Sequence, residues 1–571
     1  MLRRLSLVLA LCLMATPVLA EGLASDLGGG FVADSGDANG LASDLGGLTP
    51  DAGAAPADPN GLASDLGGGF QAAAPQQSEN YTPVDMTSAD VIIGYVDPSY
   101  SALSPTLCSD WGSVSVNQLV FESVVDLDEN MKPVPMLADN WVQDGRIWTF
   151  NLRSGIQFHN GYELTAYDVV RSYQTIISTG ASNPYYARLQ MLNTMEATDI
   201  YVLTVDAKTT SMLALYAMNF PVMQYETLYD ELPRGTGPYW YIQRDGDGTT
   251  RLEANPLWWK QQPGVKSILL KRFDTAGDAI EAIYTNRIDM LTTISPKASL
   301  SRKLANFASM DYPTLTYELL IPNLGEGSLM SDINLRQAVM FAIDRSVVAS
   351  NGYADMAIQC EVPVLPTCWL YESQSAIYYY SPERALQLLN NSGWFDLTGD
   401  GTLNKREGIM LIEPTVSIIT YNEGSNSIRE NAANLIAEYL NAVGFNASVT
   451  VKSNKTAVQE AIKDREYDLA LVGMNLSETP DISPLLSSRG NLNLNHYSNE
   501  AMDQLLDRAS QASDETLLKK VYSDIQMTVV QRLPLLGLLF RTGTVLSSRP
   551  IGGMGALRAY DNFNGFEFLS E

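Results

Sequence analysis

The clearest alternation of apolar and polar positions begins at Trp148. Trp148, Phe150 and Leu152 alternate with polar residues, which is the period of a half-buried strand. Glycines then interrupt the pattern, and Thr165 stands where its hydroxyl can cap a helix that begins at Ala166. The pattern predicts a strand, a turn and a capped helix, and by itself it predicts no chemistry.

Later segments alternate between helix and strand patterns. Leu335, Ala338, Val339 and Ala342 recur at helical spacing and predict a helix over 332–350. Strands are expected at residues 91–96, 316–321, 413–421, 449–451, 468–472 and 535–540, with a long helix ending near residue 441. Strands that alternate with helices predict an α/β lobe, and the strands at 316–321 and 535–540 are expected to cross between lobes.

Length and the first residues set the broad class. With 571 residues, 45% of them hydrophobic, the chain can bury a large core and should divide into at least two lobes. Residues 1–20 have the three zones of a secretory signal peptide. No later apolar run is long enough to span a bilayer. We expect an exported protein, in the periplasm or on the outer cell surface, without direct membrane insertion. Cys12 raises the alternative of lipidation, which Leu11 disfavours because it is large where a lipobox needs a small residue, so tethering stays open.

The chain is strongly acidic. It has 65 Asp and Glu against 37 Lys and Arg, a net charge of −28. Nucleic acids and anionic lipid surfaces are therefore poor partners, since binding them requires neutralising Lys and Arg. The acidity favours solubility outside the cell and does not identify a ligand.

Residues 21–85 are rich in Gly, Ala, Asp, Pro and Gln and poor in large apolar residues, so we expect a disordered linker. Within it GLASDLGG occurs three times, beginning at Gly22, Gly40 and Gly61. Two leucines in each copy are too few for a stacked repeat fold. The repeats are interpreted as a flexible spacer, or alternatively as a docking motif whose three copies raise avidity.

Four segments together resemble a known family. From Trp148 the sequence reads W-x-F-x-L-R-x-G-x-x-F-H-x-G-x-x-L-T-A-x-D-V. The segments at 135–141 (P-M-L-A-D-N-W), 233–239 (P-R-G-T-G-P-Y) and 255–259 (N-P-L-W-W) follow the same family's order. The chain resembles the family 5 solute-binding proteins, the receptors of dipeptide, oligopeptide and nickel ABC transporters. Trp258 and Trp259 are interpreted as packing residues.

The resemblance implies a two-lobed α/β protein with a periplasmic-binding-protein type II-like fold and a hinge between the lobes. Lobe I would comprise residues 86–315 and 541–571, and lobe II residues 316–540. Such a receptor closes on a peptide or a similar small polar solute and presents it to the permease subunits of an ABC transporter. The alternative is a receptor of the same fold for an oligosaccharide or metal chelate. An exported hydrolase and a surface adhesion or sensory protein are less favoured.

Enzymatic motifs are missing from the sequence. It contains neither G-x-S-x-G nor H-E-x-x-H, and its two histidines are His159, within the family signature, and His496. We therefore expect no enzyme and no required cofactor, although a carboxylate pair could still perform acid and base chemistry.

Ligand-binding residues are expected on both walls of the cleft. The resemblance places Asp110 and Trp111 on one wall, where an aromatic beside a carboxylate suits a peptide and its cation. On the other wall, Tyr421 and Asn422, and then Glu478 and Asp481, follow strands at the edge where α/β lobes bind ligands. Glu478 and Asp481 are candidates for holding a ligand ammonium, with surface turn carboxylates as the alternative. An Arg or Lys is expected on neither wall.

Two further features concern cysteines and a calcium loop. Cys360 and Cys368 flank a short segment in an exported chain and are predicted to form a disulfide, with buried thiols as the alternative. The following positions have EF-hand spacing around Gly401: Asp396, Thr398, Asp400, Thr402, Asn404 and Glu407. They predict a structural calcium loop, against the alternative of a bare Asp/Gly turn.

Overall fold

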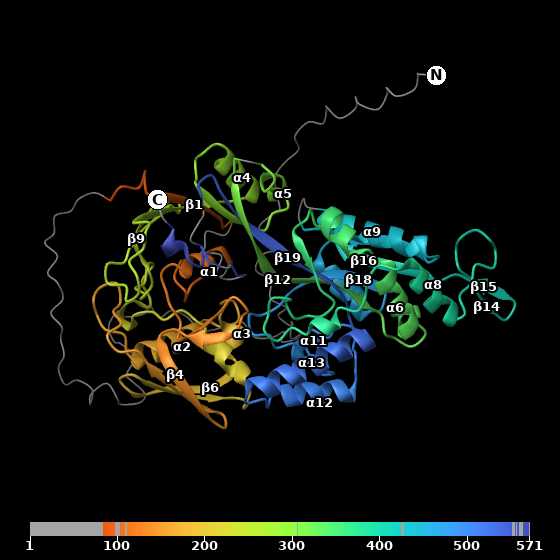
Figure 1. The fold of residues 1–571 in the computed structure, drawn as a ribbon, viewed down its shortest axis with the longest axis horizontal. Coiled ribbons are helices and arrows are strands. Elements are labelled where there is room, and N and C mark those ends of the chain that lie inside the picture. Colours follow the sequence, from red (N-terminus) through yellow and green to blue (C-terminus); the bar gives the residue numbers. More distant parts are fainter. Residues whose placement is uncertain are drawn as a thin grey trace, which may run out of the picture.

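The computed structural model describes residues 84–97, 103–108, 111–304, 306–423, 427–550, 554–555, 557–558 and 563–569. The predicted signal peptide and all three repeats lie outside these residues. The described chain forms two lobes side by side along the long axis (Figure 1). Each lobe combines strands with helices, which confirms the predicted two-lobed α/β fold.

Lobe I contains most of the first half of the chain. Its elements are β1 (Val91–Val96), α1 (Trp111–Asn117), β2 (Val125–Leu127), β3 (Pro133–Pro135), β4 (Ala138–Asp144), β5 (Ile147–Leu152), α2 (Ala166–Thr179), α3 (Tyr186–Leu189), β6 (Leu192–Asp199), β7 (Val202–Ala207), η2 (Met212–Met218), η3 (Tyr225–Thr227), β8 (Tyr239–Arg244), β9 (Thr250–Ala254), β10 (Ser267–Phe273), α4 (Ala276–Tyr284), β11 (Met290–Thr293) and α5 (Ala298–Ser301), with η7 (Phe566–Phe568) near the C-terminus. Strands β4, β5, β7 and β6 form a sheet of their own.

Lobe II follows the long strand β12 (Ala308–Pro322). Its elements are η4 (Leu329–Ser331), α6 (Ile333–Ala342), α7 (Arg345–Val347), η5 (Val348–Gly352), β13 (Ala357–Gln359), η6 (Ser373–Ser375), α8 (Pro382–Asn391), β14 (Lys405–Glu407), β15 (Met410–Ile412), β16 (Thr415–Tyr421), α9 (Ile428–Ala442), β17 (Asn446–Lys452), α10 (Lys455–Lys463), β18 (Leu469–Asn475), α11 (Ser483–Leu486), α12 (Glu500–Ala509) and α13 (Glu515–Arg532). The chain then returns through β19 (Leu536–Ser547).

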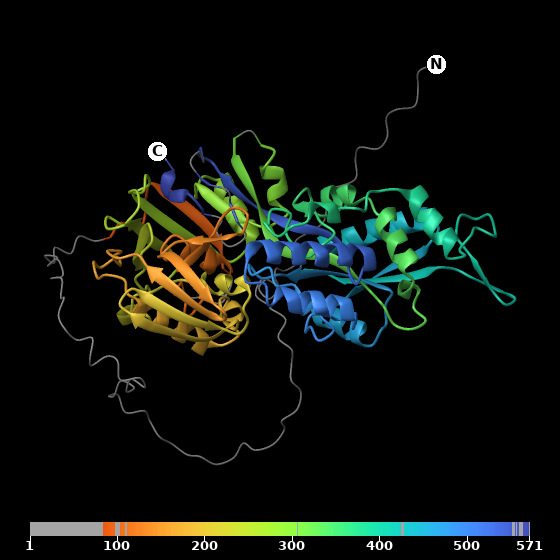
Figure 2. The ribbon, with the colours of Figure 1, turned by 60° about the horizontal axis from the view of Figure 1, so that its bottom comes forward.

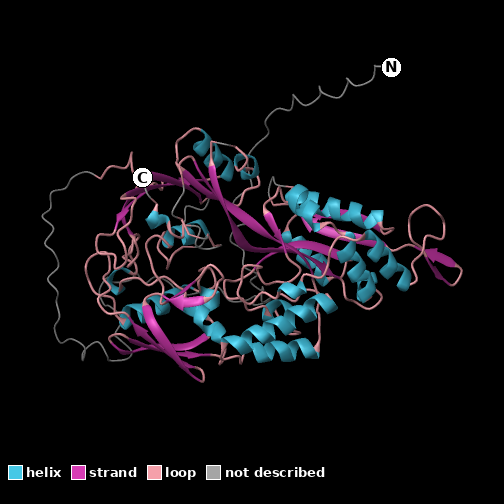
Figure 3. Cartoon of the chain, in the orientation of Figure 1, coloured by secondary structure: helices cyan, strands magenta, loops and turns pink. Residues whose placement is uncertain are grey.

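One mixed sheet runs through both lobes in the order β17-β16-β18-β12-β19-β11-β1-β10-β9-β8. Figure 3 shows β12 and β19 crossing from one lobe to the other as a long antiparallel pair. Figure 1 shows α9 on one side of this sheet in lobe II and α12 and α13 on the other. The two expected crossing segments are thus found, and the predicted lobe boundaries at 315/316 and 540/541 fall inside β12 and β19.

The ladder between β12 and β19 is irregular at its centre. Pro313 pairs with Thr542 and Tyr317 with Phe540, so three residues of β12 stand against Arg541 alone. A second register shift follows between Glu318 and Leu319. Such bulges interrupt the ladder and bend a strand locally, and here they lie where the chain passes from lobe I to lobe II.

The signature segment forms the predicted strand, turn and helix. β5 alternates between buried and less buried residues, and α2 begins at Ala166 after Thr165. The Thr165 amide donates to Asp168 Oδ2 at 3.0 Å, which is the reciprocal bond of a capping box. Burial raises the pKa of Asp168, against the lowering effect of the hydrogen bond from the Tyr225 amide.

The predicted helix over 332–350 is shorter than expected. α6 ends at Ala342, because Ile343 adopts an extended conformation (φ −89°, ψ 120°). Asp344 then caps the short helix α7 by accepting from the Ser346 amide at 3.0 Å, and a π-helical turn, η5, follows. The helical spacing of apolar residues continues past Ala342, so the sequence pattern does not reveal that the helix ends there.

The two lobes touch directly. The Met212 amide of lobe I donates to Ala512 O at 3.0 Å, and Lys132 of lobe I pairs with Glu515 of lobe II at 2.8 Å. Trp369 Nε1 of lobe II donates to the Tyr216 hydroxyl of lobe I at 2.9 Å. The structure is therefore a closed form, with the lobes in contact beside the hinge strands. None of the described helices is long and apolar enough to cross a membrane.

Candidate functional site

A small cavity lies between the two lobes beside β12. Its volume is about 120 Å³. Its described lining residues are Gln118, Asp126, Leu127, Glu129, Met131, Asn219, Leu557 and Arg558 from lobe I, Pro313 and Leu315 from β12, and Leu365, Thr367 and Glu478 from lobe II. An interlobe cavity with convergent polar groups and apolar walls is the arrangement expected of a solute-binding site.

Glu478 is the polar group that lobe II contributes. It follows the end of β18 by three residues, and it forms an ion pair with Arg188 of α3 in lobe I. The side chains are only 9% and 4% exposed. Arg188 Nη1 also donates to Asn219 O at 2.7 Å and to Asn219 Oδ1 at 3.1 Å. The predicted ammonium-binding carboxylate is therefore paired with a cation of the opposite lobe.

A second pair of opposite charges lines the same cavity. Arg558 Nη1 lies 3.8 Å from Asp126 Oδ1. Asn219 Nδ2 donates to Val125 O at 3.2 Å and to Asp126 Oδ1 at 3.4 Å, so Asn219 connects Asp126 to Arg188. The expectation that neither wall supplies an Arg was wrong, because Arg558 of lobe I lines the cavity, and Arg188 of lobe I pairs with Glu478 beside it.

The electrostatic setting of Glu478 follows from these neighbours. Burial raises the pKa of Glu478, because the charged carboxylate loses its hydration. Arg188 and, more weakly, Arg558 act in the lowering direction, and Asp126 adds to the raising. Glu478, Asp126 and Arg558 thus line the cavity, and Arg188 pairs with Glu478, so each of these charges depends on its neighbour.

The other expected ligand residues are distributed differently. Asp481 is exposed, and its Oδ1 accepts from the Ser483 amide at 2.9 Å at the start of α11. Asp481 is not among the described residues that line the interlobe cavity, which agrees with the alternative of a surface turn carboxylate. Asp110 lies outside the described residues. Trp111 is the first residue of α1, and its side chain also lies outside them.

Tyr421 and Asn422 belong to a charged network beside the hinge. The Arg429 guanidinium lies 4.4 Å from the centre of the Tyr421 ring, and Asn422 Nδ2 donates to Glu430 Oε2 at 2.8 Å. These two residues are not among the described residues that line the cavity.

The network itself joins lobe II to both hinge strands. Arg429 pairs with Glu318 of β12 at 2.8 Å and with Glu423 at 2.6 Å, and Glu423 pairs with Arg541 of β19 at 3.0 Å. Arg429 and Arg541, then the hydrogen bonds that they donate, hold the pKa of Glu423 down to about 2, against the raising effect of burial. The carboxyl end of β16 is thus fixed to the strands that connect the lobes.

The predicted disulfide is absent. Cys360 and Cys368 are free thiols, and both are buried. Cys360 Sγ donates to Val362 O at 3.1 Å, and burial raises the pKa of each thiol to about 12. The prediction from spacing was wrong: the intervening segment folds into turns, and both thiols lie unbonded in the core of lobe II.

The predicted calcium loop does not gather its ligands. The Gly399 amide donates to Asp396 Oδ1 at 2.6 Å, and the Gly401 amide donates to Asp396 Oδ2 at 3.1 Å. The remaining positions act locally: Thr402 N donates to Asp400 Oδ1, Thr398 Oγ1 donates to Asn404 Oδ1, and Glu407 lies in β14. In the described parts of the chain no group of three Asp, Glu, His or Cys side chains could hold a metal ion. The segment is a turn fixed by its own amides, and it leads into a hairpin rather than a helix.

Buried polar groups in the family motifs have structural roles. His159 Nδ1 accepts from the Gly235 amide at 3.1 Å, and the His159 amide donates to Gly235 O at 3.0 Å. A Cβ at position 235 would lie 2.1 Å from Val120 O, so only glycine fits. Burial lowers the pKa of His159 to about 3. His159 is therefore a neutral connector between two motifs and has no accessible acid or base role.

The two adjacent tryptophans do more than pack. Trp258 Nε1 donates to Glu122 Oε1 at 3.2 Å, and Trp259 Nε1 donates to Glu122 Oε2 at 2.8 Å. Thr236 Oγ1 also donates to Glu122 Oε2, at 2.8 Å. The N-P-L-W-W and P-R-G-T-G-P-Y segments thus meet on one buried carboxylate.

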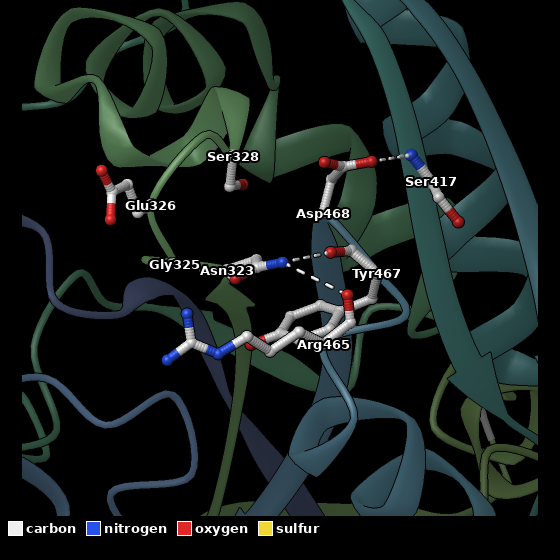
Figure 4. A pocket seen from close by; sticks show the side chains of 8 residues that line it. All are labelled: Asn323, Gly325, Glu326, Ser328, Ser417, Arg465, Tyr467 and Asp468. Atoms are coloured by element: carbon white, nitrogen blue, oxygen red, sulfur yellow. Dashed lines mark hydrogen bonds between the residues drawn. The ribbon is translucent and has the colours of Figure 1, made fainter.

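A second hollow, of about 370 Å³, lies in lobe II where β12 ends and β16 and β18 begin (Figure 4). Asn323, which follows the last residue of β12, donates through Nδ2 to Tyr467 O at 2.9 Å, and Asp468 Oδ2 accepts from the Ser417 amide at 2.8 Å. Figure 4 shows Asn323 directed toward Tyr467 and Asp468 directed toward Ser417, with Glu326 apart from them. Its described lining residues all come from lobe II, so the interlobe cavity remains the candidate site.

Fold and site together are those of a two-lobed binding protein, with a cavity between lobes that two long strands connect. The model of the bacterial extracellular solute-binding proteins, family 5, matches residues 132–494. The chain belongs to this family.

Similar proteins carry several kinds of solute. The chain is 23% identical to the oligopeptide-binding protein AppA of Bacillus subtilis (strain 168) over 78% of this chain and 85% of that protein. It is 24% identical to heme-binding protein A of Haemophilus influenzae (strain ATCC 51907 / DSM 11121 / KW20 / Rd) over 87% of this chain and 95% of that protein. The solved structure of HbpA2 from Haemophilus parasuis matches with a TM-score of 0.70 at 19% identity, covering 83% of this chain and 99% of that one.

Membership of this family fixes the general role. The protein is an extracytoplasmic solute-binding receptor of the ABC importer type, and it is not an enzyme. Both statements confirm what the sequence motifs predicted.

Proposed function

We propose that the protein captures a short peptide in the interlobe cavity and delivers it to the permease subunits of an ABC importer. The observation that carries the proposal is the set of opposite charges at the cavity, where Glu478, Asp126 and Arg558 line the wall and Arg188 pairs with Glu478. A free peptide carries an ammonium at one end and a carboxylate at the other. Glu478 and Asp126 would hold the ammonium, and Arg558 would hold the carboxylate.

The size of the cavity supports a small solute. Pockets for drug-sized ligands have volumes of about 300–1,000 Å³, and the closed cavity is only about 120 Å³. A dipeptide needs far less rearrangement of the closed form than a heme or a long peptide. Leu127, Met131 and Leu315 supply apolar wall on which side chains of differing shape can rest.

Arg188 keeps Glu478 useful as a ligand partner. Without a nearby cation, a carboxylate buried to this degree would take up a proton and lose its attraction for an ammonium. The ion pair with Arg188 opposes that protonation. A ligand ammonium would then join an existing pair of charges rather than an isolated one.

Calorimetry with three ligands tests the proposal. A free dipeptide, its N-acetylated form and its C-amidated form are titrated into the unmutated protein and into Glu478→Gln, Arg558→Gln and the matched control Asp481→Asn. Loss of a buried charge partner costs about 3–5 kcal/mol, a few hundredfold or more in affinity.

We expect Glu478→Gln to weaken the free and amidated peptides while changing the acetylated one little. Arg558→Gln should weaken the free and acetylated peptides. Asp481→Asn should change none of them, because Asp481 serves only an exposed turn. Equal binding of free and acetylated peptide by the unmutated protein would contradict ammonium capture and favour a neutral solute such as an oligosaccharide.

A further inference from the structure

One carboxylate at the interlobe cavity is left over when the two ends of a peptide have been bound. Glu129, in the turn between β2 and β3, lines the cavity and is exposed, so it stands where the cavity opens to solvent. Glu478 and Asp126 each have an arginine partner. Among the described residues no Lys, Arg or His forms an ion pair with Glu129.

The lysine on the same turn is engaged elsewhere. Lys132 Nζ pairs with Glu515 Oε2 at 2.8 Å, at the start of α13, and it lies 5.7 Å from the centre of the Trp369 ring. Figures 1 and 2 both show α13, drawn in blue, beside lobe I. Lys132 thus serves the contact between the lobes, and the negative charge of Glu129 remains available to a ligand.

The turn that carries Glu129 is fixed in position. Asp128 Oδ1 accepts from the amides of Asn130 and Lys132, both at 2.8 Å. The Trp369 amide of lobe II donates to Asn130 O at 2.9 Å. The backbone on the C-terminal side of Glu129 is therefore held by its own turn and by the opposite lobe. A group held in place in this way loses little conformational entropy when a ligand binds to it.

The charges at the cavity do not balance. The charged residues of its described lining are three carboxylates, Asp126, Glu129 and Glu478, and one guanidinium, Arg558. Arg188 adds a second guanidinium beside Glu478. A dipeptide with uncharged side chains has one ammonium and one carboxylate and adds no net charge. One negative charge therefore remains, and a single basic side chain of the ligand would cancel it.

We propose that Glu129 selects peptides that carry a lysine or arginine side chain, whose cation it binds at the opening of the cavity. The inference rests on the proposed capture of a peptide by Glu478 and Arg558. Leu127 and Met131, which lie on either side of Glu129 in the chain, are buried and line the cavity. Long basic side chains lay their methylene groups on apolar surface and keep the charged end in water. A small closed cavity can thus accept such a side chain, because the charged end stays in the opening.

The expected preference is modest because Glu129 is exposed. Exposed ion pairs contribute little, which corresponds to a gain in affinity of up to about fivefold. A ligand glutamate in the same place would meet a like charge and lose a similar factor. We therefore expect lysine-containing peptides to bind more tightly than glutamine-containing ones, and glutamate-containing ones to bind most weakly.

Calorimetry with matched dipeptides measures this order. Alanyl-lysine, alanyl-glutamine and alanyl-glutamate are titrated into the unmutated protein, together with the three peptides of reversed order, since either residue of a dipeptide can face the opening. The readout is the ratio of the affinities for the lysine and the glutamine peptide. We expect this ratio to be higher at about 20 mM salt than at about 500 mM, because salt screens an exposed pair.

Variants assign the preference to one residue. Glu129→Gln should bring the ratio close to one, and Glu129→Lys should reverse the order so that the glutamate peptide binds more tightly than the lysine peptide. The matched control is Glu407→Gln, which removes one negative charge from an exposed residue of β14. It should keep the ratio of the unmutated protein, because Glu407 is not among the described residues that line the cavity.

The outcomes separate this inference from the proposed function. Equal binding of the lysine and glutamine peptides by the unmutated protein would overturn the inference and leave peptide capture standing. A lysine preference that survives Glu129→Gln would assign it to another carboxylate, and one that Glu407→Gln also removes would assign it to net charge, so either result rejects Glu129. Failure of every dipeptide to bind would overturn both proposals.

Discussion

Arg188 of lobe I and Glu478 of lobe II form an ion pair across the interlobe cleft, and more than nine-tenths of each side chain is buried. The pair joins the lobes at the cavity wall, so it affects both the stability of the closed form and the charge that a ligand meets. Because each partner has left water, removal of one leaves the other without compensation.

Arg188→Gln should destabilise the protein at pH 7 by about 3–5 kcal/mol, since Glu478 would be buried as an unpaired anion. Burial already raises the pKa of Glu478 above its ordinary 4.5, and loss of Arg188 would raise it further. A raised folded pKa means that stability falls as pH rises through the interval above 4.5. The deficit of the variant should therefore be smallest near pH 4. Urea unfolding at several pH values measures it.

The control is Arg146→Gln, which removes an exposed arginine that lies 3.5 Å from Asp206. Exposed pairs contribute about 0–1 kcal/mol, so this variant should remain close to the parent at every pH. A deficit of Arg188→Gln that stayed constant from pH 4 to pH 7 would show that Glu478 is not the group affected.

His159 should make the protein less stable in mild acid. Burial lowers its pKa to about 3 from the ordinary 6.5, so the unfolded chain binds a proton that the folded chain refuses. Stability is then lost as pH falls below 6.5. From pH 6.5 to pH 5 the loss from this residue is about 2 kcal/mol. Urea unfolding at the two pH values should show a lower free energy of unfolding at pH 5 than at pH 6.5. Other titrating groups add their own contributions to this difference.

Nuclear magnetic resonance isolates the residue itself. The chain has two histidines, so the ring signals of His159 and His496 can be told apart with a His496→Gln variant. We expect the His159 signals to keep their position between pH 7 and pH 5. A shift centred near pH 6.5 would contradict the buried neutral imidazole.

The thiols of Cys360 and Cys368 should be unreactive in the folded protein. Burial raises the pKa of each to about 12, so thiolate is scarce and reagent cannot reach it. A thiol reagent such as Ellman's should label them only after denaturation, and reductant should leave the melting temperature unchanged. A drop in melting temperature with reductant would reveal a disulfide after all.

Local patterns predicted local structure well. The strand at β5 and the helix at α2 follow from alternation and from a cap that acts over three residues. By contrast, the break after Ala342 arises because Asp344 caps a new helix. The apolar stripe alone would favour one unbroken helix, so the two alternatives compete. Local pattern cannot decide that competition, because tertiary packing does.

Of the predicted ligand residues, the structure places Glu478 at the interlobe cavity, and its role in binding stays a prediction. It was singled out because it follows a strand at the edge where α/β lobes bind ligands. Its partner Arg188 lies in a four-residue helix of the other lobe, and no spacing or motif connects the two. Likewise the link between His159 and Gly235 joins two recognised motifs, but only the folded chain shows that they touch. Contacts between the lobes depend on how the lobes come together. The periodicity of the sequence carries no information about that arrangement.

The bulge in the hinge has a mechanical consequence. Where three residues of β12 stand against Arg541, the ladder between β12 and β19 is interrupted, so this ladder can bend there with the least loss of its own hydrogen bonds. Arg541 is itself tied to Glu423, and Glu423 to Arg429. The stiffness of the hinge thus depends on ion pairs whose residues do not line the cavity. Altering one of those charges would change the free energy of separating the lobes, and every described cavity-lining residue would stay the same.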